Sequence, residues 1–157
     1  MKIEQKLAEM GLKLPSARKP VGNYVGAVRA GNLVFISGHG PALEKANGEL
    51  EMIRGKVGRD LTLEQGYEAA KLVALHLLRA LKEVIGDLDK VVRIVKLLGM
   101  VNTADGFKDQ PKVINGASDL LVALWGDAGR HARSAVGMYE LPFGISVEIE
   151  AIVEVRD

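Results

Sequence analysis

Residues 145–156 alternate between two kinds of side chain, with one exception at Ile152. The run ISVEIEAIVEVR places an apolar residue at every odd position, while most even positions are polar. Because successive side chains of a β-strand point to opposite faces, a period of two predicts a strand with one covered and one open face. The odd set should lie beneath helices, and the even set, with its three carboxylates, should lie on the opposite face.

Two long segments supply the helices that such a sheet needs. Residues 62–85 begin with the capping-box pattern TLEQ, carry one apolar stripe at helical spacing and end before a glycine. Residues 111–125 begin with a proline, which suits the first turn of a helix, and also end before a glycine. A shorter helix is predicted at the N-terminus, where Ile3, Leu7 and Met10 form an apolar stripe.

The remaining apolar runs are predicted to be strands. Residues 23–36 hold two of them on either side of an Ala-Gly-Asn turn, which is a hairpin signal. With the last strand, the order is strand-strand-strand-helix-strand-helix-strand-strand, which indicates an α+β sheet with helices on one face. The other predicted strands are residues 50–57, 91–101 and 133–138.

Composition indicates an ordinary globular domain and excludes several classes of site. Lys and Arg number 21 against 20 Asp and Glu, so charge gives no reason to expect nucleic acid as a partner. The absence of cysteine excludes disulfides and thiolate catalysis, and it fits a reducing compartment. The three histidines show no metal-ligand spacing, so we expect no metal site.

The first residues and the lack of long apolar runs bear on location and domain organisation. The N-terminus is too charged for a signal peptide, and no run is long enough to span a membrane, so we expect a cytoplasmic protein. No internal repeat or long linker divides the chain. We therefore expect an N-terminal helix and linker over residues 1–20 and a single domain over residues 21–157.

The last two predicted strands carry the first candidates for a functional site. Val136 and Met138 suit the core, so Arg133 and Ala135 should face away from the helices, on the same side as Glu148. An arginine can grip a carboxylate through two hydrogen bonds, and a glutamate can move protons to and from water. The same residues could instead form a structural ion pair or simply meet water, and their spacing does not decide between these alternatives.

Four segments carry a resemblance to a known family: VGNYVGAV, GNLVFISGHGP, ARSAVGMYELPFG and VEIEAIVEV. The most specific parts are the ARS tripeptide, the Leu-Pro break and the VEIEA of the last strand. Together these segments resemble the RidA/YjgF family, over about residues 21–155. The polar stretch over residues 43–60 is longer than in short members, which is typical of a divergent, longer-chain branch.

The resemblance implies a chorismate-mutase-like fold, with a mixed sheet and two main helices on one face. It also implies a homotrimer with ligand pockets between subunits. By position, Arg133 matches the arginine that binds the substrate carboxylate, and Glu148 matches the glutamate associated with the attacking water; both would be catalytic. Other pocket-lining positions would be Tyr24, Ser37, Gly38, Asn115 and Pro142.

The chain departs from the family pattern at several pocket positions. Asn23 stands where proline commonly precedes the tyrosine, and Ala135 stands where many members have cysteine. His39 and Phe143 also replace the usual residues. These changes leave Arg133 and Glu148 in place, so they bear on the substrate more than on the fold.

The activity implied by the resemblance is hydrolytic deamination of reactive 2-enamine and 2-imine carboxylates of the 2-aminoacrylate type. The products would be 2-keto acids and ammonia, and no metal or organic cofactor is implied. One alternative is a non-catalytic trimer that senses small carboxylates. Another is endoribonuclease, a label that this family also carries. The 4% content of aromatic residues, the lack of a basic stripe and the lack of a paired catalytic histidine argue against RNA cleavage.

Overall fold

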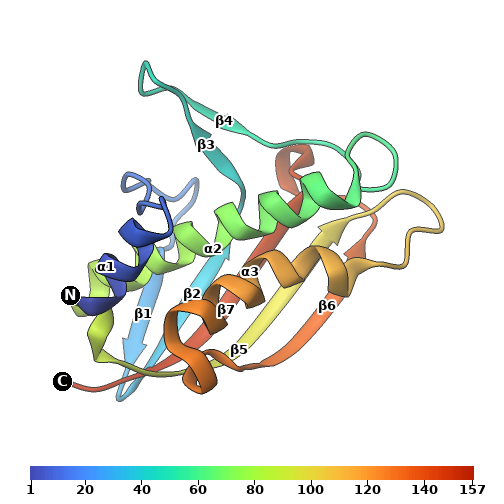
Figure 1. The fold of residues 1–157 in the computed structure, drawn as a ribbon. Helices are drawn as coiled ribbons and strands as arrows, with labels where there is room; N and C mark the ends of the chain where they lie inside the picture. The colour runs from blue at the N-terminus through green and yellow to red at the C-terminus, as the bar shows by residue number, and fades with distance from the viewer.

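A five-stranded mixed sheet forms one layer of the molecule, and the helices cover one face of it (Figure 1). The computed structural model describes all 157 residues. Neighbouring strands follow the order β1-β2-β7-β5-β6, in which only β5 and β6 run parallel. This arrangement confirms the predicted α+β class. The strand bounds are β1 Ala27–Ala30, β2 Leu33–His39, β5 Val91–Asn102, β6 Ala132–Met138 and β7 Val147–Val155.

The two main helices, α2 (Leu63–Ile85) and α3 (Gln110–Trp125), lie side by side on this face. The predicted capping box of α2 is present: the Thr62 hydroxyl accepts the N–H of Gln65, and the Gln65 side chain accepts the N–H of Thr62. Gly116 lets α3 approach closely, because a Cβ there would lie 2.0 Å from a backbone oxygen of α2. None of the helices combines the length and apolar character needed to cross a bilayer.

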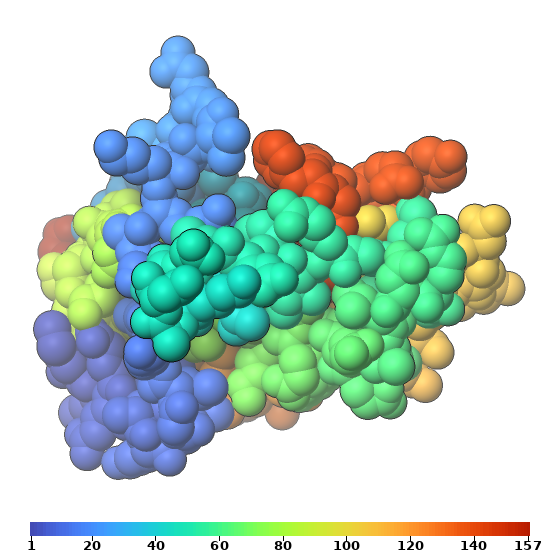
Figure 2. All heavy atoms as spheres, turned by 90° about the horizontal axis from the view of Figure 1, so that it is seen from above, coloured from blue at the N-terminus to red at the C-terminus, as the bar shows by residue number.

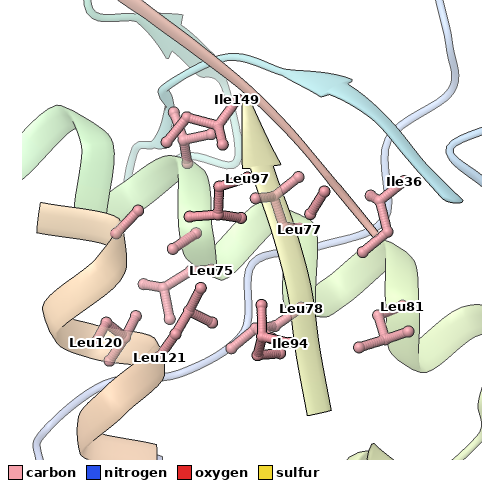
Figure 3. Close-up of a cluster of buried hydrophobic side chains, with 14 of the residues drawn as sticks. Ile36, Leu75, Leu77, Leu78, Leu81, Ile94, Leu97, Leu120, Leu121 and Ile149 are labelled. Carbon is pink, nitrogen blue, oxygen red and sulfur yellow. The ribbon is translucent and has the colours of Figure 1, made fainter. Parts of the chain in front are cut away.

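The hydrophobic core lies between the two helices and the sheet (Figure 3). Leu97 of β5 and Ile149 of β7 are fully buried there, opposite Leu78 and Leu121 of the helices. The odd positions of β7 from 147 to 155 are all buried, as the alternation predicts. Truncating one of these leucines to alanine would cost about 2–5 kcal/mol of stability.

The N-terminal helix α1 (Lys2–Glu9) packs onto the same core through Ile3 and Leu7. Met10, predicted to belong to its apolar stripe, lies beyond the helix and is exposed, because the helix ends one residue earlier. The carboxylate of Asp89 accepts the backbone N–H groups of the first two helical residues at 2.8 and 2.9 Å. It also pairs with the terminal amino group at 3.0 Å, so it fixes the start of the chain.

A small hairpin stands apart from the main sheet (Figure 1). The strand predicted over residues 50–57 is only β4 (Leu50–Met52), and it pairs with β3 (Ala42–Glu44), which the sequence did not predict. Three-residue strands are too short to show a period of two. Ile145, predicted to lie beneath the helices, precedes β7 and packs instead with Met100 and Leu141 in a separate cluster.

Candidate functional site

Glu148 lies on the open face of the sheet, as the alternation of β7 predicts. Its carboxylate is half-buried and has no hydrogen bond or ion pair within the chain. Burial raises the pKa of Glu148, and the nearby charge of Glu150 raises it further. A carboxylate whose pKa is moved toward neutrality is better suited to give and take protons.

Gly38 makes room for this carboxylate. An irregularity in the pairing of β2 with β7, between Ile36 and His39, brings the backbone of Gly38 over the Glu148 side chain. A Cβ at Gly38 would lie 2.7 Å from Oε2 and 3.0 Å from Cδ of Glu148. A larger residue at this position would therefore displace the carboxylate from where it lies.

A cavity of about 400 Å³ opens beside Glu148. Four of the predicted site residues line it together: Tyr24, Gly38, Pro142 and Glu148. Figure 2 shows two of its walls from above, the blue segment that follows α1 and the orange-red segment that precedes β7. The geometry thus brings together residues that lie more than a hundred positions apart in the sequence.

Ser37 lies beside this cavity but does not line it. Its hydroxyl donates to the carbonyl of Val25 at 2.6 Å, and its N–H donates to the carbonyl of Gly26 at 2.9 Å. Both donors are therefore used to hold the segment that follows Tyr24. The exposed Tyr24 side chain, by contrast, lines the cavity and has no hydrogen-bond partner in the chain.

Arg133 lies on the face opposite to the one predicted. Its register partner in the parallel pair is Leu97, and paired residues point to the same side of a sheet, so Arg133 faces the helices. Ala135 likewise packs against the core, whereas Val136 is exposed on the open face. The prediction was wrong because β6 is an edge strand, where apolar residues do not mark the core side. Arg133 and Glu148 therefore do not meet within one chain.

Arg133 is nevertheless held in a defined position. One guanidinium nitrogen donates to Asn115 Oδ1 at 2.8 Å and to Ser118 Oγ at 3.0 Å. The Ser118 hydroxyl can then donate to Nε2 of His131, 2.9 Å away, because Nδ1 of that ring donates to the carbonyl of Gly129. No carboxylate lies within ion-pair distance of Arg133, so the structural ion pair considered above does not form within the chain. Sequence reasoning placed Asn115 at the site but missed the support from Ser118 and His131.

The other two histidines have similarly fixed rings. Nδ1 of His39 bonds the carbonyl of Ser37 at 2.6 Å, and Nε2 of His76 bonds the carbonyl of Ala42 at 2.8 Å. Burial lowers the pKa of both histidines, and it also lowers the pKa of His131. All three rings are therefore held in the neutral form near neutral pH. No group of three His, Asp or Glu side chains is arranged to hold a metal ion.

Two arginines that sequence reasoning did not select also line the cavity. Arg54 lies just beyond β4, and Arg18 lies in the segment between α1 and β1. They belong to stretches with no motif, so only the fold brings them to Glu148. The arrangement can bind a small anion and place water near a carboxylate with a raised pKa.

Comparisons with known proteins agree with this fold. Residues 4–147 match the family described as "YjgF/chorismate_mutase-like, putative endoribonuclease". The chain is 40% identical to Protein TCP17 of Trypanosoma cruzi over 99% of this chain and 96% of that protein. It is similar to Atu1372 of Agrobacterium tumefaciens, a crystal structure of unknown function (43% identity, TM-score 0.87, 99% of this chain and 94% of that one). It is also similar to a crystal structure from Shewanella oneidensis MR-1 described as a "putative endoribonuclease" (32% identity, TM-score 0.92, 99% and 100% coverage).

Proposed function

Because this chain belongs to the YjgF/chorismate-mutase-like family, we propose that it hydrolyses small 2-imine and 2-enamine carboxylates. The products are 2-keto acids and ammonia, and no metal or organic cofactor takes part. The observation that carries the proposal is the unpaired, half-buried carboxylate of Glu148, with its raised pKa, in the wall of a small cavity that also holds cationic side chains. The lack of cysteine fits the cytoplasmic location that we propose for it.

The chemistry needs only water and one group that moves protons. Ionised Glu148 accepts a proton from a water molecule as the water oxygen attacks the C=N carbon, and it passes that proton to the nitrogen. Glu148 then carries the hydroxyl proton of the carbinolamine to its nitrogen, so that the C–N bond breaks, ammonia leaves and the C=O bond forms. Such proton transfer contributes about 10²- to 10⁴-fold to a rate. That gain suffices because small imines already hydrolyse in water.

We further propose that the carboxylate of the substrate is bound by Arg133 of a neighbouring copy, within a homotrimer. Two observations support this assembly. Arg133 has no carboxylate partner and lies near the edge of the sheet, on the face away from Glu148 of its own chain. The open face also exposes the apolar side chains of Val28, Phe35 and Val136, which a second copy would cover. A contact between unlike surfaces forms a closed ring of three copies when each copy is rotated by one third of a turn relative to the next.

The experiment generates several 2-imino acids with an amino-acid oxidase and follows their decay with and without the protein. We expect faster decay with the wild type, and about a 10²-fold or greater loss with Glu148→Gln, which keeps size and hydrogen bonding but removes the basic carboxylate. Glu154→Gln, on the same strand and face, is the matched control and should retain the wild-type rate.

Two results would count against the hydrolase. Binding of 2-ketobutyrate without any acceleration of imine decay would favour the carboxylate sensor instead. Turnover that survives Glu148→Gln in a folded protein would assign the proton transfer to another group.

A further inference from the structure

The cavity beside Glu148 carries more positive charge than one carboxylate ligand needs. Arg18, Lys19 and Arg54 line it, and Glu148 is the only acidic residue among the lining side chains. None of the three cations forms an ion pair, whereas Arg59, Arg79 and Arg130 elsewhere on the surface each pair with a carboxylate. Positive groups left unpaired around a concave surface indicate that the ligand supplies the missing negative charge.

Arg54 is held in place for such a role. Its Nε donates to the carbonyl of Phe143 at 2.9 Å, and its backbone bridges to Ile145, so the root of the guanidinium is fixed. Its two terminal nitrogens have no partner within the chain and remain available for a two-point contact with a carboxylate. The hydrogen bond to Phe143 thus ties Arg54 to the segment that precedes β7.

The backbone conformation of Phe143, which also lines the cavity, is a second unusual feature of the segment that precedes β7. It has a φ of 62°, the only residue other than glycine with a positive φ, and its side chain lines the cavity. This conformation costs about 1–3 kcal/mol for such a residue and persists only where its surroundings impose it. The strained backbone turns the carbonyl of Phe143 toward Arg54 and keeps an apolar ring beside the charged groups.

Arg18 also lines this cavity, and it comes from the segment between α1 and β1. One of its terminal nitrogens lies 3.7 Å from the sulfur of Met52, a weak acceptor that does not neutralise its charge. Because both arginines line the same cavity, a carboxylate bound there can meet Arg18 and Arg54 together.

Building on the proposed function, we propose that this site is specific for imines and enamines that carry two carboxylates. Glu148 faces the C=N carbon, and the 2-carboxylate meets Arg133 of the neighbouring copy. The second carboxylate, at the far end of the substrate, meets Arg54 and Arg18. A substrate with one carboxylate leaves this second group of cations unpaired. The substrate class is thus the imines formed by oxidation of acidic amino acids, together with their enamine tautomers.

The test compares two imines made in place, 2-iminoglutarate from glutamate and 2-iminobutyrate from 2-aminobutyrate, each with a suitable oxidase. We expect kcat/KM to be at least tenfold higher for 2-iminoglutarate. Arg54→Gln keeps an N–H donor for the Phe143 carbonyl but removes the charge. It should lower the ratio of the two kcat/KM values by about 10- to 100-fold, the usual size for a charged hydrogen-bonded contact. Arg130→Gln, an exposed arginine paired with Asp127, is the matched control.

Calorimetry with 2-ketoglutarate and 2-ketobutyrate gives a second readout that does not depend on turnover. We expect tighter binding of 2-ketoglutarate, with the difference lost in Arg54→Gln. Equal efficiency for the two imines, or an unchanged ratio in Arg54→Gln, would overturn the specificity and leave the hydrolase proposal standing. Failure to hydrolyse either imine would overturn the hydrolase proposal. The calorimetric preference and its dependence on Arg54 would then still decide the specificity.

Discussion

Replacing Gly38 with alanine tests whether the position of the Glu148 carboxylate matters for hydrolysis. The new Cβ would lie 2.7 Å from Oε2 of Glu148, whereas an ordinary contact begins at 3.4 Å, so the carboxylate must move by about 0.7 Å or rotate away. Gly38 does not have a positive φ, so alanine brings no backbone strain there. The carboxylate ends a flexible side chain, and we expect a stability loss of only about 1 kcal/mol.

The effect on turnover should be much larger than the effect on stability. A displacement of about 1 Å from the productive position costs roughly 10²-fold in rate, so kcat/KM for imine hydrolysis should fall by about that factor. The assay is the oxidase-coupled decay of 2-imino acids, beside a thermal melt of each variant. Full activity in a folded Gly38→Ala protein would show that this carboxylate does not need its observed position.

A double-mutant cycle identifies Glu148 as the group through which Gly38→Ala acts. If the alanine acts by displacing the carboxylate, it should cost little more activity once Glu148→Gln has removed the proton-transfer group. If the two losses simply multiply, Gly38→Ala disturbs something other than Glu148, and the proposed effect on the carboxylate does not occur.

Arg133→Ala should weaken 2-ketobutyrate binding by about 1.5–3 kcal/mol in calorimetry, and Arg133→Lys should recover little because lysine lacks the planar fork; wild-type affinity in the alanine variant would contradict the proposed contact. Stability should fall as the pH drops below about 6.5, because burial lowers the pKa of His39, His76 and His131 in the folded chain, so the unfolded chain binds more protons. A thermal midpoint that is the same at pH 8 and pH 5.5 would contradict this. Asp89→Asn should lower the free energy of unfolding by about 1 kcal/mol, since the amide is a weaker acceptor for the first N–H groups of α1; unchanged denaturant midpoints would show that this contact is dispensable.

Strong periodic signals predicted the fold well. The alternation of β7 and the capping box of α2 are local patterns, and each specifies both an element and the side that it buries. The face of β6 was predicted wrongly because Val136 is apolar yet exposed on the open face. If a second copy covers this face, the apolar residue reflects the assembly, which a rule for single chains does not take into account.

The composition of the site could be predicted only in part. The family resemblance selected both Glu148 and Gly38, which the structure places next to each other. It gave no reason to select Arg18 or Arg54, because both lie in stretches without a motif and reach the cavity only through the fold. Nor did it indicate that Ser118 supports Arg133, since that contact depends on how α3 crosses the sheet.

In the proposed hydrolytic site, one copy supplies Glu148 and the next copy supplies Arg133. The most direct measurement is a complementation assay of two variants, Glu148→Gln and Arg133→Ala, each expected to hydrolyse 2-imino acids poorly when pure. Co-expression in equal amounts should restore activity to about one quarter of the wild-type value, because random assembly into a ring leaves both native residues at about one interface in four. Activity of the mixture no higher than that of the pure variants, in confirmed mixed oligomers, would contradict a site shared between copies.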